Sequence, residues 1–298
     1  MGEIYGFTKL SLLALIASTA CGRTPLDSAA AAQAEGGSAG TGTRGFVQIA
    51  AGAEYACGLR VDGSASCWGD NTYGQSISPA GTFTEISAGW GHTCGLRADG
   101  SATCWGDNSY GQAIPLAGAF TQISAGGTHT CGLRSNGGAF CWGEAYASAS
   151  TPATGIFTQV SAGGTHTCAL GVDGSVSCWG YGGDGQASPP AGTFTEVSAG
   201  AFHTCGLRVD SSAACWGDNS YGQATAPAGV FTQVSAGWGH TCGLRADGSA
   251  ACWGRNEYGQ ATAPAGAFTQ ISAGGIHTCG LRPDGSATCW GGLAAPAQ

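Results

Sequence analysis

The stretch 231–267 reads FTQVSAGWGHTCGLRADGSAACWGRNEYGQATAPAGA, and its pattern decides the fold. Its first six residues, FTQVSA, alternate apolar and polar side chains, as a half-buried strand does. HTCGLR and SAACWG are two further extended runs separated by the turn sequence ADG, and YGQATAP is a weaker fourth that ends at Pro264. No run has the 3.6-residue periodicity of a helix, and glycine recurs every few residues. The stretch therefore predicts a unit of four short strands.

The same unit recurs along the chain at a constant step of 37 residues, without insertion or deletion between the cysteines. One phenylalanine and one tryptophan keep this step through seven copies: Phe46, Phe83, Phe120, Phe157, Phe194, Phe231 and Phe268, with Trp68, Trp105, Trp142, Trp179, Trp216, Trp253 and Trp290. A fixed internal period is the signature of a repeat architecture and takes precedence over local patterns.

Seven four-stranded units are typical of a β-propeller, a ring of four to eight blades. A linear β-solenoid is the alternative, but it needs distinct capping repeats, and here the terminal copies resemble the middle ones. We therefore predict an all-β fold, a seven-bladed β-propeller of 37-residue repeats over residues 44–298.

Each repeat contains a Cys-x9-Cys hairpin, shown in the first copy by CGLRVDGSASC at 57–67. The loop 61–63 fits a type I turn followed by a glycine in the left-handed region. Arg60 and Ser64 then close the hairpin, and the ladder places the two cysteines opposite each other at a non-hydrogen-bonded pair. Cα atoms at such a pair lie about 4.5 Å apart, within the range of about 4.4–6.8 Å that disulfides bridge.

We therefore predict one disulfide in every blade. Zinc is the first alternative, but zinc motifs usually space their cysteines two to four residues apart. Free thiols are the second, and they fit a cytosolic protein better than an exported one. The predicted pairs are Cys57–Cys67, Cys94–Cys104, Cys131–Cys141, Cys168–Cys178, Cys205–Cys215, Cys242–Cys252 and Cys279–Cys289.

The segment 1–21 is interpreted as an export signal. Residues 10–20, LSLLALIASTA, form an apolar run that is shorter than the roughly 20 residues of a membrane span and fits a signal peptide. Cleavage could follow a small residue, or Cys21 could be the acylated cysteine of a lipoprotein. The odd fifteenth cysteine favours lipidation of Cys21, because the other fourteen form pairs. Residues 22–43 are small and polar and indicate a flexible linker.

Composition excludes several classes of function. The chain has 298 residues, a net charge of −8 and only 10 Lys and Arg residues, so it has no basic stripe for nucleic acid. It also has no phosphate-binding loop, no metal-ligand motif and no set of catalytic residues outside the repeats. We expect no enzymatic activity, no cofactor and no metal, and a monomer that meets the membrane only through its lipid anchor.

Several motifs resemble the RCC1-like repeat family of seven-bladed propellers: WGDNSYGQ at 216–223, AG-x-x-H at 236–240 and LRADG…CWG at 244–254. The match covers residues 44–298, although repeats 3 and 4 depart from it with WGEAYASAS at 142–150 and WGYGGDGQ at 179–186. The short unit is similar to small secreted bacterial members, which include a β-lactamase inhibitor. This resemblance implies a propeller that binds a protein through its loops.

Most recurring side chains are interpreted as structural. The six histidines share one repeat position, occupied by Tyr55 in the first copy, and a metal-binding ring is the alternative to one repeated hydrogen bond within each blade. The seven tryptophans are expected to pack between blades, and the Arg and Asp series beside the hairpin turn to form solvated charges or weak pairs. Recurring Asn and Tyr in another loop set could bind sugars, but Asn is also a common turn former.

The informative positions are those that vary while the frame stays fixed. The two residues before the histidine position carry large apolar side chains in four copies: Trp90, Phe202, Trp238 and Ile276. The resemblance implies that such loop residues contact a partner, and exposed aromatic side chains on a rigid frame are good anchors. Their alternative role is packing over the mouth of the central channel.

The sequence thus predicts an exported or surface-anchored protein that binds an extracytoplasmic protein, for instance as an enzyme inhibitor. The alternative is a glycan-binding, lectin-like propeller, and an enzyme is the third class.

Overall fold

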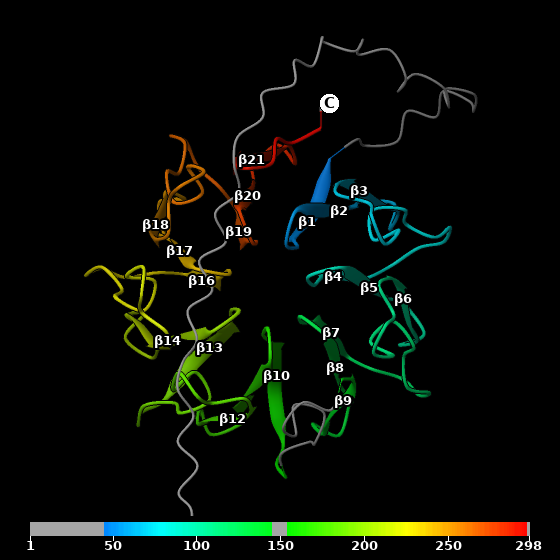
Figure 1. Cartoon of the computed structure of the whole chain (residues 1–298), viewed down its shortest axis with the longest axis horizontal. Coiled ribbons are helices and arrows are strands. Elements are labelled where there is room, and N and C mark those ends of the chain that lie inside the picture. Colours follow the sequence, from blue (N-terminus) through cyan, green and yellow to red (C-terminus); the bar gives the residue numbers. More distant parts are fainter. Residues whose placement is uncertain (1–44, 145–153, 297–298) are drawn as a thin grey trace, which may run out of the picture. The chain divides into compact units, whose positions relative to one another are not determined.

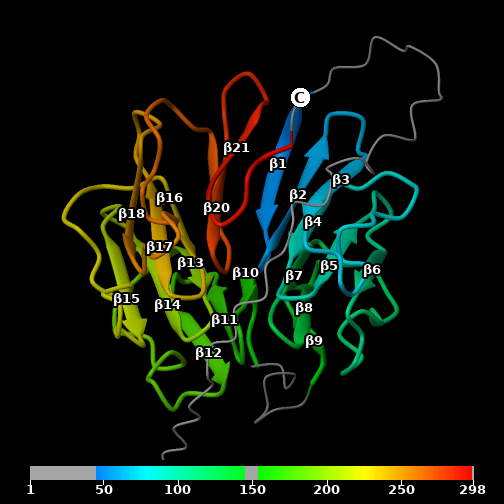
Figure 2. The same cartoon turned by 45° about the horizontal axis from the view of Figure 1, so that its top comes forward.

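The computed structural model describes residues 45–144 and 154–296, which fold into a ring of seven three-stranded sheets (Figures 1 and 2). This confirms the prediction of an all-β, seven-bladed propeller. The predicted export signal, the linker 22–43 and Cys21 lie outside the described residues. Within those residues, no helix is long and apolar enough to span a membrane.

Each blade consists of three consecutive antiparallel strands. The inner strands, one per blade, are β1 (Phe46–Ala51), β4 (Glu85–Ala88), β7 (Gln122–Ala125), β10 (Phe157–Ala162), β13 (Phe194–Ala199), β16 (Gln233–Ala236) and β19 (Gln270–Ala273). The middle strands are β2 (Tyr55–Arg60), β5 (His92–Leu96), β8 (His129–Leu133), β11 (His166–Gly171), β14 (His203–Arg208), β17 (His240–Leu244) and β20 (His277–Leu281). The outer strands are β3 (Ala65–Gly69), β6 (Ala102–Gly106), β9 (Ala139–Gly143), β12 (Val176–Gly180), β15 (Ala213–Gly217), β18 (Ala250–Gly254) and β21 (Ala287–Gly291).

The ring closes by packing of blade 1 against blade 7, without exchange of a strand between them. The inner strands follow one another around the axis, and β1 also contacts β19 and β20 (Figure 1). The backbone N–H of Phe46 donates to the carbonyl oxygen of Gly285 at 2.8 Å, and Phe46 packs beside Leu281. Every blade is therefore built from three strands that are consecutive in the sequence, including the two blades that join the ends of the ring.

The hairpin register is the one expected from the sequence. Arg60 donates its backbone N–H to the carbonyl of Ser64, Cys57 faces Cys67, and Gly63 has a φ of +81°. All seven predicted disulfides are present, with Cα–Cα distances of 4.0–4.1 Å, slightly closer than the 4.5 Å expected. The prediction of one disulfide per blade is therefore confirmed.

The fourth strand expected in each unit does not form. In the stretch 258–264, Gly259 donates its backbone N–H to the carbonyl of Asn256, and Thr262 donates to Gly259. These bonds, together with the left-handed Gly259 (φ +84°), bend the chain into consecutive turns. The backbone groups that would pair with the outer strand are thus used locally, and the sheets have three strands.

The core lies in the seams between blades, as predicted for the tryptophans. Phe83 and Trp105 of blade 2 pack against Leu59 and the disulfide of blade 1. The ring centroids of Phe83 and Trp105 lie 5.8 Å apart. The indole N–H of Trp105 donates to the carbonyl of Gln75 in the preceding repeat at 2.9 Å. Trp142, Trp216, Trp253 and Trp290 make the same bond, so these five tryptophans both fill a seam and satisfy the indole N–H there, whereas the buried indole N–H of Trp68 has no partner among the described residues.

The arginine series interacts only weakly with the solvated turn aspartates, as expected; the lowered pKa of Asp99, for example, is caused mainly by hydrogen bonds from Ser101 and only to a minor extent by Arg97. In addition, these arginines lie over phenylalanine rings, and Arg97 Cζ is 5.0 Å from the ring centroid of Phe83. The aspartates accept hydrogen bonds from turn serines, as Asp99 does from Ser101. The only ion pair in the part of the chain that the structure describes joins Arg255 and Glu257.

Candidate binding face

The strand pairing divides the loops into two opposite ends of the ring. Tyr55 at the start of β2 pairs with Gly69 at the end of β3, so the loops 52–54 and 70–76 lie at the same end. We call this end, in all seven repeats, the aromatic face. The β2–β3 turn and its six counterparts form the opposite end, the hairpin face.

Two of the predicted contact residues meet over the channel mouth at the aromatic face. The rings of Trp90 and Trp238, from opposite sides of the ring, lie edge to face with centroids 5.4 Å apart. Both are half-buried, and Ala-Gly steps from all seven blades surround them. Trp90 reaches across to blade 4, since a Cβ on Gly164 would be 2.8 Å from its Cζ2. The packing role is thus observed for this pair, whose outer surface remains partly accessible.

Phe202 and Ile276 occupy the next position in the repeat and differ from the tryptophan pair. Phe202 is 40% exposed, while Ile276 is half-buried and lies against Gly292. From the sequence we grouped these four residues as one set of contact candidates, but in the structure they occupy two different places on the aromatic face. The first position of the loop lies at the channel mouth, and the second lies farther from it.

Tyrosines of the outer loops extend the aromatic face. Their exposed fractions are 50–58%, and they are Tyr73, Tyr110, Tyr221 and Tyr258. The neighbouring asparagines stabilise the loops, because Asn71 accepts the backbone N–H of Ser76 and Asn219 accepts that of Ala224. The turn-forming role of asparagine is therefore confirmed at these positions.

The charges of the ring are distributed unequally between its two ends. The hairpin face carries the balanced Arg and Asp series. Among residues 45–144 and 154–296, the aromatic face carries seven acidic residues and one basic residue, Arg255; the acidic ones are Glu54, Asp70, Asp107, Glu144, Asp184, Asp218 and Glu257. This end is therefore both aromatic and acidic.

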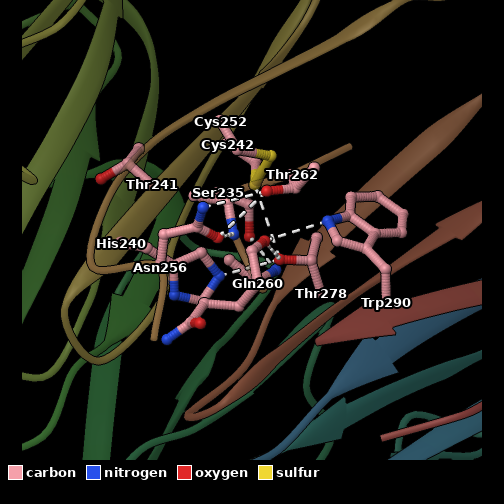
Figure 3. The surroundings of a disulfide bond; sticks show 12 residues. Ser235, His240, Thr241, Cys242, Cys252, Asn256, Gln260, Thr262, Thr278 and Trp290 are labelled. Carbon is pink, nitrogen blue, oxygen red and sulfur yellow. Dashed lines mark hydrogen bonds between the residues drawn. A yellow bond between two sulfur atoms is a disulfide. The ribbon is translucent and has the colours of Figure 1, made fainter. Parts of the chain in front are cut away.

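We had expected each histidine to bond within its own blade, but five of the six bond to a threonine of the neighbouring blade; His277 does not, because Ala56 occupies the threonine position in blade 1. His240 Nε2 lies 2.8 Å from Thr278 Oγ1 of the next blade, and that hydroxyl donates to the carbonyl of Gln260 (Figure 3). Trp290 Nε1 donates to the same carbonyl at 2.9 Å. The other histidine–threonine pairs at 2.7–2.8 Å are His92–Thr130, His129–Thr167, His166–Thr204 and His203–Thr241.

These contacts determine the protonation state of the histidine rings. Because Thr278 uses its only hydroxyl proton toward Gln260, His240 must carry a proton on Nε2 and donate it. Burial, the main cause, lowers the pKa of His92, His166 and His240 to about 3, and that of the other three histidines to about 4. The six rings are thus neutral at ordinary pH.

A polar belt lines the central channel and was not anticipated from the sequence. At the third position of each FTQVSA-type strand, the side chain accepts the backbone N–H of the next blade, as Gln48 Oε1 does from Ile86 at 2.9 Å. The belt consists of Gln48, Glu85, Gln122, Gln159, Glu196, Gln233 and Gln270. Burial raises the pKa of Glu85 and Glu196 to about 7. The signal was the recurring Gln or Glu at this position.

No metal cluster is found among residues 45–144 and 154–296: no three side chains of the usual ligand types gather closely enough to hold an ion. The recurring polar groups of the seams and the channel instead bond to neighbouring blades.

The sequence of the chain matches the family model of the regulator of chromosome condensation (RCC1) repeat in six places. The matched residues are 46–75, 83–112, 120–145, 157–186, 194–223 and 231–260. No curated protein matches the chain. The more specific likeness to a β-lactamase inhibitor is not confirmed by these matches.

Solved structures of similar fold come from several organisms. The CRINKLY WD40 ectodomain of the Arabidopsis thaliana receptor kinase ACR4 is 30% identical, with a TM-score of 0.70 over 85% of this chain and 99% of that chain. The ectodomain of the Physcomitrella patens receptor kinase CR4 is 27% identical, with a TM-score of 0.72 over 83% of this chain and 74% of that chain. Prp20p from Saccharomyces cerevisiae, 18% identical with a TM-score of 0.63, covers 70% of this chain and 72% of its own length and shows the fold alone. On the repeat matches and the ectodomain likeness, this chain belongs to the RCC1 repeat family.

Proposed function

We propose that this protein is an extracytoplasmic, non-catalytic module that binds another protein on its aromatic face. The observation that carries the proposal is the concentration of exposed aromatic side chains, Phe202 and the four tyrosines, at one end of a rigid ring. Large aromatic residues supply much of the binding energy at protein interfaces. Inhibition of an extracytoplasmic enzyme is one concrete form of this function.

Two further observations support the compartment and the class. Seven disulfides are typical of proteins in oxidising environments outside the cytoplasm. The two similar structures with the higher identities are ectodomains of receptor kinases, in which the propeller stands outside the cell membrane. Both facts favour an extracytoplasmic binding role.

Phe202→Ala is expected to weaken partner binding at least tenfold, because it removes an exposed anchor without opening the core. The partner is first captured from extracytoplasmic extracts with the intact propeller, and its affinity for both forms is then measured by surface plasmon resonance. Val209→Ala is the matched control, since Val209 is 67% exposed on the hairpin face. Unchanged binding by Phe202→Ala, or loss only with Val209→Ala, would reject the proposed face. Glycan-array hits without a protein partner would favour the lectin alternative.

We also propose that Cys21, which lies outside the described residues, is acylated and anchors the protein to a membrane. In the native host, Cys21→Ser is expected to move the protein from the membrane fraction to the soluble fraction, because one thiol carries the anchor. Mass spectrometry of the N-terminal peptide checks the modification directly. A soluble, unmodified wild-type protein would contradict the anchor and leave the propeller's binding role unaffected.

A further inference from the structure

On the aromatic face, the side chains of Tyr73 and Asp107 flank Gly91, the residue that follows Trp90, and we call this site the notch. A Cβ on Gly91 would be 3.3 Å from Tyr73 Cδ2 and 3.4 Å from Asp107 Cβ, so these side chains flank it on two sides. Tyr73 is 58% exposed. Gly91 adds no side chain of its own, so the exposed ring of Tyr73 and the side chain of Asp107 lie on either side of bare backbone.

The corresponding place four repeats along the chain shows what such a notch accepts. There, Gly239 is flanked by Tyr221 and by Arg255, which replaces the aspartate of the other repeat. The guanidinium carbon of Arg255 lies 5.3 Å from the ring centroid of Tyr221 and 5.9 Å from that of Tyr258. The repeat therefore places a guanidinium over the tyrosine ring when the chain itself supplies one.

We propose that the notch formed by Tyr73, Gly91 and Asp107 binds an arginine side chain of the protein partner. The ring of Tyr73 would receive the cation on its face, and the carboxylate of Asp107 would accept its N–H groups. This inference rests on the proposed function and adds to it the kind of side chain, an arginine, that the partner places at one site of the aromatic face. The partner surface is accordingly basic.

The charge distribution supports a basic partner. Seven of the eight charged residues that the structure describes on the aromatic face are acidic, and the one cation among them, Arg255, already pairs with Glu257. The hairpin face, with equal numbers of Arg and Asp, offers no such field. Opposite potentials steer a partner toward one face and select against partners of the wrong charge.

The repeat also supplies a variant that closes the notch without disturbing the fold. Asp107 accepts hydrogen bonds from Ser109 and Gln112, but repeats 4 and 6 have Tyr181 and Arg255 at this position and keep the same blade. Asp107→Arg copies repeat 6 and places a guanidinium of the chain in the notch. Arg255→Asp is the reciprocal change and opens a second notch over Gly239.

The experiment uses the intact propeller labelled with ¹³C-tyrosine and titrated with N-acetyl-arginine amide, while Tyr73 and Tyr221 ring signals are followed by NMR. Those signals are assigned with Tyr73→Phe and Tyr221→Phe. We expect a saturable shift of Tyr73 with a dissociation constant on the order of tens of millimolar. The neutral isostere N-acetyl-citrulline amide is the matched control and should produce no saturable shift. Asp107→Arg should weaken the Tyr73 response at least tenfold, and Arg255→Asp should create one at Tyr221.

An equal response to citrulline, or an Arg255→Asp protein whose Tyr221 signal does not move, would overturn the inference. If Asp107→Arg does not fold, Asp107→Asn still removes the charge and should weaken the response severalfold. Failure of the notch is distinguishable from failure of the proposed function. A partner that requires Phe202, combined with no arginine response, rejects only the notch, whereas an arginine response without any protein partner rejects the wider proposal.

Discussion

Lowering the pH from 7 to 5 is expected to remove roughly 7 kcal/mol from the free energy of unfolding of the disulfide-intact propeller. The main cause is the six seam histidines, whose pKa values of about 3 to 4 lie below the 6.5 of an exposed histidine. Because the unfolded chain binds more protons over this range, stability is present above pH 6.5 and is lost as the pH falls toward the folded pKa values. The six groups together account for about 11 kcal/mol of loss.

The channel glutamates act in the opposite direction. Glu85 and Glu196 have a pKa of about 7 in the folded protein, against 4.5 for an exposed glutamate. The folded state therefore binds more protons between pH 7 and 4.5, which adds about 4 kcal/mol by pH 5. The histidine contribution is larger, so the net effect of acid is destabilising.

Guanidinium unfolding at pH 7, 6 and 5, followed by tryptophan fluorescence, measures this loss. The first repeat supplies a matched variant, because Tyr55 occupies the histidine position and donates to the backbone carbonyl of His92. His166→Tyr should reduce the proton uptake on unfolding by about one, or about 1.4 kcal/mol per pH unit where the histidine titrates. Equal stability at pH 7 and 5, or a His166→Tyr protein with an unchanged slope, would contradict the assignment.

Reduction of the disulfides is expected to unfold the ring. Each of the seven closes a loop with a sequence separation of 10, which contributes about 3 kcal/mol in the chain-entropy account. Losing all seven would exceed the 5–15 kcal/mol that stabilises ordinary domains. Circular dichroism after reduction in mild denaturant and return to buffer should therefore show loss of the strand signal, while the oxidised protein treated in parallel should regain it.

Removing the disulfide of a single blade is expected to destabilise the ring without unfolding it. Cys242→Ala combined with Cys252→Ala removes one disulfide and should lower the free energy of unfolding by about 2–3 kcal/mol. This corresponds to a fall in the melting temperature of roughly 5–10 °C. The oxidised wild type is the reference, and alkylation without reductant should label none of its fourteen paired cysteines. A reduced protein with unchanged melting would show that the hydrophobic seams alone hold the blades.

The sequence predicted features that depend on contacts within one repeat. The closing pair Arg60–Ser64 and the Cys57–Cys67 pairing follow from turn chemistry and the two-residue period of a strand, and both are observed. The prediction of a fourth strand was wrong, because the turns around Gly259 and the Asn256 side chain use the backbone groups that would have paired with the outer strand. An alternating apolar pattern alone does not show where hydrogen bonds within turns replace the hydrogen bonds between strands.

Features that depend on neighbouring blades were harder to predict. His240 was expected to bond within its own blade, but its partner Thr278 lies 38 residues away across a seam. Trp90 and Trp238 were grouped with Phe202, although only closure of the ring brings the two tryptophans together. The charge of the aromatic face likewise emerges only when the third strand places Asp107 and Glu257 at the same end. Repetition in the sequence shows that a contact recurs, but not with which copy it is made.

The most direct test of the account is photo-crosslinking from the aromatic face. A benzophenone amino acid replaces Phe202 in one sample and Val209, on the opposite face, in the other. After irradiation with extracytoplasmic extract, mass spectrometry identifies the adducts. We predict that position 202 crosslinks one protein with an exposed basic surface and that position 209 does not. A protein adduct from position 209 alone, or no protein adduct from position 202, would contradict binding through the aromatic face.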